Sequence, residues 1–263
     1  AAYHIYKRVK RPKDINVPEP AVLRDDLLYG YYGTVGTQAA ETKGYVNLLW
    51  EAQWGGPDKV VDNILTAKTY TVLDLGLIIY EKFAPSGRNH KLRQDFEQLL
   101  RERLSFYHTK DVLQYIKTLV IMDEPNTNVV SKEDFRTAIN AVKRIAKEFP
   151  ELNNVKYACI YAAKPVDFWC IEEFDYVGLD DYDELSGIFT NGIYERITSR
   201  MRPDSKTILL PGGGFGQELK PFWNYAHNNK EVGMLIPFTW LDGEDPRDTW
   251  IGLGNPRNPR KME

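Results

Sequence analysis

Two adjacent carboxylates, Asp123 and Glu124, follow the uninterrupted apolar run 119–122 and stand directly before Pro125. Such a run is typical of a strand that is buried on both faces, as in a parallel sheet. The strand must end at Pro125, because proline has no N–H to donate to a neighbouring strand. Parallel α/β folds carry their chemistry at the carboxyl ends of their strands, so the pair is a candidate for acid–base catalysis. The alternative is that the two carboxylates only cap the next turn.

The order of apolar and helical segments indicates how this pair is positioned. Eight runs could form strands, namely 27–32, 45–50, 69–75, 116–122, 155–161, 174–179, 207–210 and 233–238. Helices are expected at 58–68, at 92–106, between a Ser131 N-cap and Pro150, and at 219–228. This alternation predicts the α/β class, with a single (β/α)8 barrel over 27–250, an N-terminal arm over 1–26 and a C-terminal tail over 251–263.

A doubly wound open sheet is the main alternative fold. It would show a G-x-G-x-x-G turn after its first strand. Gly30, Gly33 and Gly36 instead have G-x-x-G-x-x-G spacing, which favours the barrel.

The carboxyl ends of all barrel strands meet on one face, which we call the mouth. The candidate catalytic residues there are Glu124, Asp123, Asp180 and Asp181. The candidate substrate-binding residues are Tyr31, Tyr32, Asn47, Trp50, Glu51, Asp74, Asn126, Tyr161, Tyr182 and Trp240. Aromatic rings stack on the apolar faces of sugars, while carboxylates and amides bind sugar hydroxyls. The mouth therefore predicts a carbohydrate substrate. Core packing is the alternative for the tryptophans, and loop solvation or helix capping for Asp180 and Asp181.

The segment Ile121-Met122-Asp123-Glu124-Pro125 resembles the fourth-strand end of (β/α)8 glycoside hydrolases. In the retaining clan of cellulases and β-galactosidases this strand ends in Asn-Glu-Pro. Here Asp123 replaces the asparagine, while Glu124 and Pro125 match. The resemblance implies that Glu124 is the acid/base. The nucleophile of that clan is a glutamate at the end of the seventh strand, where this sequence has Leu-Pro-Gly-Gly-Gly-Phe-Gly at 210–216.

Two further resemblances suggest how a second catalytic group could be supplied. The Asp123-Glu124 pair is similar to that of substrate-assisted hexosaminidases, in which the aspartate orients a 2-acetamido group and the glutamate protonates the leaving oxygen. No seventh-strand nucleophile is then required. The segment 177–182 (Val-Gly-Leu-Asp-Asp-Tyr) resembles the sixth-strand end of several α-glycosidases, which implies Asp180 or Asp181 as the partner carboxylate.

These observations predict a glycoside hydrolase that acts on a polysaccharide or glycan by carboxylate general-acid catalysis. One alternative is a non-catalytic barrel that binds glycans or has a structural role. Another is a phosphate-binding lyase or isomerase that uses Lys164 as a Schiff-base amine and the Gly212–Gly216 loop as an anion cradle. The acidic mouth argues against an anionic substrate, because its carboxylates would repel one.

Composition excludes several other classes. A net charge of −3 argues against a general nucleic-acid binder, and no apolar run is long enough for a membrane span. The four histidines show no metal-ligand spacing, so we expect no cofactor or metal, although carboxylates at Asp180, Asp181 and Asp183 could bind Mg²⁺ or Ca²⁺. The sequence begins without a methionine or a signal-peptide pattern, from which we expect a processed or trimmed chain. A glycan substrate favours an extracellular or secreted location, and the oligomeric state is not assigned.

Overall fold

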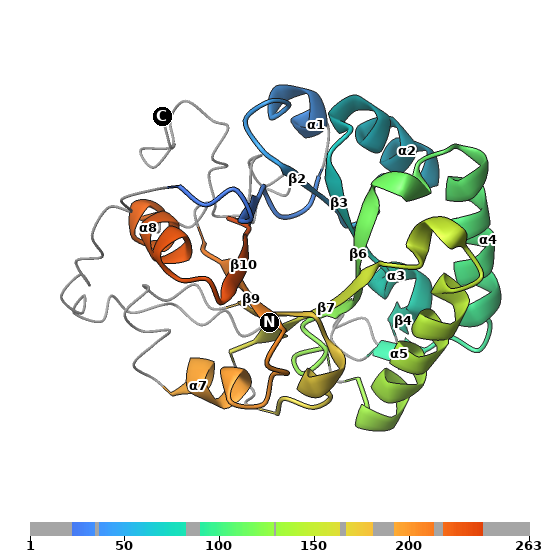
Figure 1. The fold of residues 1–263 in the computed structure, drawn as a ribbon. Coiled ribbons are helices and arrows are strands. Elements are labelled where there is room, and N and C mark those ends of the chain that lie inside the picture. The colour runs from blue at the N-terminus through green and yellow to red at the C-terminus, as the bar shows by residue number, and fades with distance from the viewer. Residues whose placement is uncertain are drawn as a thin grey trace, which may run out of the picture.

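The chain forms a barrel of parallel strands with helices around it (Figure 1). The computed structural model describes residues 23–34, 37–82, 90–128, 130–163, 167–180, 192–212 and 218–238. Within them the ring order is β1-β10-β9-β8-β7-β6-β3-β2. The strands are β1 (Leu28–Tyr29), β2 (Leu48–Glu51), β3 (Tyr70–Asp74), β6 (Ile116–Asp123), β7 (Lys156–Ala162), β8 (Tyr176–Asp180), β9 (Lys206–Leu210) and β10 (Val232–Leu235). The predicted (β/α)8 architecture is confirmed.

The α-helices of the described residues lie outside this ring (Figure 1). They are α1 (Gln38–Glu41), α2 (Gly56–Ala67), α3 (Gly76–Ile79), α4 (Phe96–Thr109), α5 (Lys132–Ala146), α7 (Ile193–Thr198) and α8 (Lys220–Asn228). Short 3₁₀ turns are η1 (Leu113–Tyr115), η2 (Pro150–Leu152) and η3 (Ile171–Glu173). The expected cap of α5 is confirmed, because Ser131 Oγ accepts the Asp134 N–H at 3.0 Å.

One helix begins later than predicted. An antiparallel pair, β4 (Tyr80–Lys82) and β5 (His90–Leu92), occupies the start of the expected 92–106 helix. Leu92 pairs with Tyr80, and the Arg93 N–H donates to the Ile79 carbonyl, so the strand runs to Leu92 and a turn leads to the N-cap at Asp95. Helical spacing of apolar residues cannot reveal such a local pairing.

Apolar side chains form two separate layers. Inside the ring, a small core includes Leu48, Val72, Val120, Ile160 and Ile208. A larger core lies between the strands and the helices. Because side chains alternate along a strand, each strand contributes to both layers. In the sequence, each strand is therefore a continuous apolar run.

The barrel closes between β1 and β2 without a regular strand pairing. Asn47 bridges them: its side chain accepts the Tyr29 N–H at 2.7 Å and donates to the Leu27 carbonyl at 2.9 Å. Its own N–H donates to the Tyr29 carbonyl at 3.2 Å. Gly30 permits this approach, since a Cβ there would lie 2.3 Å from the Leu48 carbonyl oxygen. A residue with any side chain would push the two strands apart.

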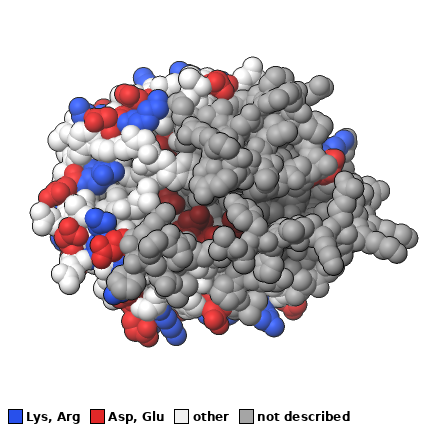
Figure 2. All heavy atoms as spheres, turned by 180° about the vertical axis from the view of Figure 1, so that it is seen from behind, with Lys and Arg blue, Asp and Glu red and all other residues white. Residues whose placement is uncertain are grey.

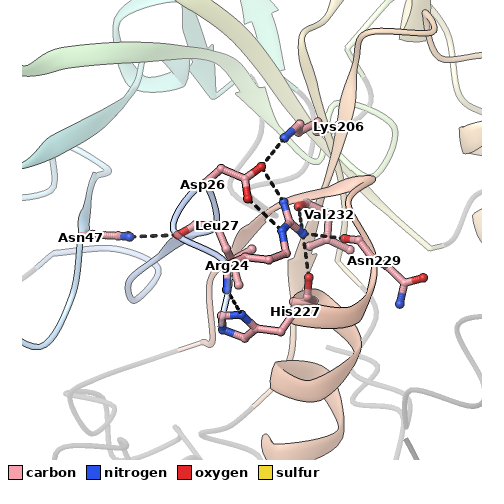
Figure 3. Close-up of polar contacts among 9 residues, drawn as sticks. Arg24, Asp26, Leu27, Asn47, Lys206, His227, Asn229 and Val232 are labelled. Carbon is pink, nitrogen blue, oxygen red and sulfur yellow. Dashed lines mark hydrogen bonds and ion pairs between the residues drawn. The ribbon is translucent and has the colours of Figure 1, made fainter. Parts of the chain in front are cut away.

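Arg24 binds the start of the described chain to α8 and β10 (Figure 3). Its Nη1 donates to the carbonyls of Ala226, Asn229 and Val232 at 2.6–2.9 Å, and its backbone N–H donates to His227 Nδ1 at 2.8 Å. Asp26 in turn pairs with Arg24 and with Lys206 of β9. Residues 23–26 are therefore bound to the barrel, which steadies the short strand β1.

Candidate active site

A bulge in β6 turns Asp123 into the barrel. Val120 pairs with Ala158 and Asp123 pairs with Ile160. Between these pairs β6 therefore advances by three residues while β7 advances by two. Ala158 and Ile160 both belong to the interior core. In a regular strand Met122 would point inward and Asp123 outward, because side chains alternate. Met122 instead packs in the outer core, and Asp123 takes the interior position.

Carboxylates at the ends of β3, β6 and β8 form what we call the acidic arc, made of Asp74, Asp123, Glu124 and Asp180. Asp74 ends β3 and pairs with the interior residue Val120. Asp180 ends β8, two residues after Gly178. A Cβ added at Gly178 would contact Ile160 and Ile208 inside the barrel, and Asp180 lies on the same face of the strand because side chains alternate. Figure 2 shows Asp and Glu side chains gathered in a recess near the centre of the face opposite to that of Figure 1.

Glu124 follows β6 in a backbone conformation that is rare for a residue with a side chain. Its φ is 49°, and its N–H donates to the Ile160 carbonyl at 2.8 Å. A left-handed conformation costs a non-glycine residue about 1–2 kcal/mol and recurs at functional sites. The turn that follows is tied to β7 by Asn126, whose side chain bonds both the N–H and the carbonyl of Ala162.

Aromatic side chains line the other side of the mouth and form the aromatic arc, made of Tyr32, Trp50 and Phe238. They come from the contiguous strands β1, β2 and β10. The Tyr32 ring centroid lies 5.3 Å from that of Trp50 and 5.8 Å from that of Phe238. Trp54, which is half exposed, contacts Tyr32 at its edge and lies over Gly33. One side of the mouth is thus acidic and the other is aromatic, with Tyr32 and Trp50 buried.

Tyr32 joins the two arcs, because its hydroxyl donates to Asp123 Oδ2 at 2.6 Å. Burial, with the charges of Glu124 and Asp74, raises the pKa of Asp123 well above its ordinary value, and the Tyr32 hydrogen bond opposes that shift. Burial also raises the pKa of Asp74 to about 6, partly offset by the Gly76 N–H that bonds its Oδ1 at 2.8 Å. Asp123 therefore binds a proton more tightly than an exposed aspartate does.

A buried carboxylate oxygen and a buried indole nitrogen of the mouth have no hydrogen-bond partner among the described residues. They are Asp123 Oδ1 and the indole nitrogen of Trp50, a residue with no exposed surface. Unpaired buried polar groups are costly, and functional sites are one place where they occur. Asp123 Oδ1 is therefore suited to bind a ligand hydroxyl.

Several predicted substrate-binding residues do not face the mouth. Asn47 lies before β2, at the opposite end of the barrel, where it closes the seam. Glu51 is buried against α2, and burial raises its pKa to about 8, which the neighbouring Asn63 and Thr34 side chains partly oppose. Tyr161 packs in the outer core and donates its hydroxyl to the Trp169 carbonyl. For these three the expected placement is wrong: pairing register turns Glu51 and Tyr161 outward, whereas Asn47 precedes its strand.

Among the remaining predicted residues, the structure brings together Tyr32, Trp50, Asp74, Asp123, Glu124 and Asp180, while Asn126 supports the turn. Tyr31 is half-buried, and burial raises its pKa to about 12. Asp181, Tyr182, Trp240, Asp183, Lys164 and the loop 213–216 lie outside the described residues. Phe238 was not predicted, although it continues the alternation of Met234 and Ile236 and could have been found from it.

The seventh barrel strand carries no carboxylate at its described end. β9 finishes at Leu210 and continues into Pro211 and Gly212. No group of three or more potential metal-ligating His, Cys, Asp or Glu side chains occurs in the described part of the chain. None of its helices has the length and apolarity needed to cross a membrane.

No family model and no curated protein sequence matches the chain. Among solved structures, it is similar to the glycoside hydrolase family 17 β-1,3-glucanosyltransferase of Rhizomucor miehei, with a TM-score of 0.60 and 12% identity over 86% of this chain and 92% of that one. A mutant of that enzyme in complex with laminaritriose matches with a TM-score of 0.58 and 12% identity over the same shares.

The β-glucuronidase of Ruminococcus gnavus is also similar, with a TM-score of 0.53 and 8% identity over 86% of this chain. The match spans 46% of that enzyme. At identities this low, the structural similarity shows a common fold alone. The resemblance to (β/α)8 glycoside hydrolases that the sequence predicts is therefore confirmed at the level of the barrel.

Proposed function

We propose that this chain is a glycosidase in which Glu124 protonates the glycosidic oxygen. The observation that carries the proposal is the mouth itself, where four carboxylates face an arc of aromatic rings. This combination serves a substrate with both hydroxyls and apolar ring faces, which is the character of a sugar. The fold shared with glycoside hydrolases supports the proposal as an analogy.

The proposed chemistry follows from the position of each group. Glu124 gives its proton to the leaving oxygen as the bond from that oxygen to the anomeric carbon breaks. Asp180 is the partner carboxylate that stabilises the positive charge developing on the sugar, because the described end of β9 offers none. Water then adds to the anomeric carbon and gives a proton to the Glu124 carboxylate, which restores the acid. Asp123 binds a hydroxyl of the same sugar through its Oδ1.

The test is a hydrolysis screen on oligosaccharides and polysaccharides with the wild type, Glu124→Gln and a control, Glu133→Gln on the exposed side of α5. The glutamine at 124 preserves the side-chain shape and removes the transferable proton. We expect a loss of 10²–10⁴-fold in rate for Glu124→Gln and wild-type rates for the control. Hydrolysis that survives in Glu124→Gln would show that another group is the acid.

A non-catalytic glycan-binding barrel is the second candidate, favoured by the absence of a carboxylate at the described end of β9. The same screen separates it from the glycosidase. Binding without turnover, equal in the wild type and in Glu124→Gln, would establish the binding function and refute the enzyme.

A further inference from the structure

A cavity of about 380 Å³ lies outside the ring of strands, between the start of α2, α3 and α4. Gln53 and Gly56 reach it from the carboxyl end of β2, and Ile78 reaches it from that of β3. It is therefore on the same end of the molecule as the mouth. Its charged lining residues are Arg93, Arg103 and Glu102, and its apolar ones include Leu77 and Phe106.

Arg103 is held in place by a neutral partner. Its Nη1 donates to Gln53 Oε1 at 2.7 Å, and no carboxylate of the described residues lies within ion-pair distance of it. The same Gln53 oxygen accepts the Tyr107 hydroxyl at 3.0 Å, and Gln53 Nε2 donates to the Asp74 carbonyl. Gln53 is buried, with a φ of 60°. A buried amide network thus fixes the guanidinium but leaves its charge unneutralised.

Arg93 supplies a second guanidinium with unused donors. Its Nε is buried without a hydrogen-bond acceptor among the described residues. Asp95 Oδ1 lies 3.7 Å from that nitrogen, which is an ion pair but too long for a hydrogen bond. Two guanidinium groups facing one cavity match the geometry of a carboxylate or a sulfate, whose oxygens accept paired N–H donors.

We propose that this cavity binds a sugar unit that carries an oxyanion, either a uronate carboxylate or a sulfate ester. Arg93 and Arg103 bind the oxyanion, Glu102 accepts hydrogen bonds from hydroxyls, and Phe106 and Leu77 pack on an apolar ring face. Trp54 is partly exposed and contacts Tyr32 of the mouth. In the sequence it directly follows Gln53, which lines the cavity. The acidic mouth repels an anionic unit, so the glycan would place a neutral unit there and its acidic unit in the cavity.

The identity of the ligand as a glycan rests on the proposed function, whereas oxyanion binding by the two arginines does not. Calorimetric titration tests both, with inorganic sulfate, a uronate-containing tetrasaccharide, a sulfated tetrasaccharide and a neutral tetrasaccharide as probes. The variants are Arg103→Gln and Arg93→Gln. Arg101→Gln is the matched control, because Arg101 lies on the same helix α4 but is bound to Glu148 at 2.9 Å.

We expect an acidic tetrasaccharide to bind the wild type and Arg101→Gln equally, and each cavity variant about tenfold more weakly, as the loss of one charge-assisted hydrogen bond implies. Sulfate should compete with the acidic tetrasaccharide. Whichever of the uronate-containing and the sulfated tetrasaccharide binds with the higher affinity identifies the oxyanion. Affinities unchanged in both cavity variants, an equal loss in Arg101→Gln, or tighter binding of the neutral tetrasaccharide would overturn the inference.

Inorganic sulfate keeps the two proposals apart, since its binding should depend on Arg93 and Arg103 and not on the catalytic residues of the mouth. Arginine-dependent binding without turnover of any glycan would refute the glycosidase and support the cavity site. Turnover combined with binding that is insensitive to Arg93 and Arg103 would refute the cavity site alone.

Discussion

Tyr32 and Asp123, 91 residues apart in the sequence, are joined by a hydrogen bond of 2.6 Å inside the barrel. Tyr32 follows β1 and Asp123 ends β6, and in the ring order β2 and β3 stand between these strands. The bond therefore crosses the mouth and links its aromatic arc to its acidic arc. Because a hydrogen bond to a carboxylate favours the ionised form, Tyr32 moderates the proton affinity that burial gives Asp123.

Tyr32→Phe should raise the pKa of Asp123 further, since burial and the charges of Glu124 and Asp74 then act without opposition. A carbon NMR titration of labelled aspartate side chains measures the shift. We also expect roughly a tenfold loss of glycosidase activity, as for removal of one hydrogen bond to a charged group. Tyr70→Phe is the control, because Tyr70 bonds Thr118 at 2.6 Å, remote from Asp123 in the ladder. An Asp123 titration unchanged by Tyr32→Phe would contradict the assigned role.

Asp74→Asn should move the same titration in the opposite direction. The negative charge of Asp74 raises the pKa of Asp123, so a neutral amide at 74 lowers it. Asp74 itself has a pKa raised to about 6, and the wild type should show this second titration while the variant loses it. Shifts of the same sign in Asp74→Asn and Tyr32→Phe would mean that charge coupling does not govern the mouth.

Glu51→Gln should change how stability depends on pH. The pKa of Glu51 is about 8 in the folded chain against an ordinary value of 4.5, so the folded state retains a proton that the unfolded state has released between these values. Stability is then lost as pH rises from about 4.5 to 8, at up to about 1.4 kcal/mol per pH unit, and is level above 8. Thermal unfolding at pH 5 and pH 8 measures the slope, which the variant should reduce.

Exposed Glu133 provides the comparison for that experiment. Glu133→Gln should leave the slope between pH 5 and pH 8 as it is in the wild type. Equal slopes in Glu51→Gln and the wild type would show that Glu51 does not keep its proton in the folded state.

Gly30→Ala should open the seam of the barrel. The added Cβ would lie 2.3 Å from the Leu48 carbonyl oxygen, a backbone atom that cannot rotate away. We expect a loss of roughly 1–3 kcal/mol in the free energy of unfolding, as for overpacking in a core. Hydrogen exchange localises the effect: the Asn47 and Thr34 amides, which bond Tyr29 and Trp50 across the seam, should lose protection, while β7 amides keep theirs. Unchanged protection at Asn47 would argue against a strained seam.

The order of strands was predictable from the sequence because a strand buried on both faces of a parallel sheet appears as a continuous apolar run. Pro125 and Gly33 mark where two of these runs end, so the position of Asp123 and Glu124 at a strand end also followed from local pattern. The helix cap at Ser131 is likewise a local feature and was predicted correctly.

Which way each side chain points was decided by the tertiary structure. Asp123 faces the interior only because β6 gains a residue relative to β7, and Glu51 and Tyr161 face outward because their register places them there. A shift of one residue exchanges the two faces of a strand, and the partner strand that fixes the register lies far away in sequence. Closure of the ring is equally non-local, which is why Asn47, expected at the mouth, instead joins β1 to β2 at the other end.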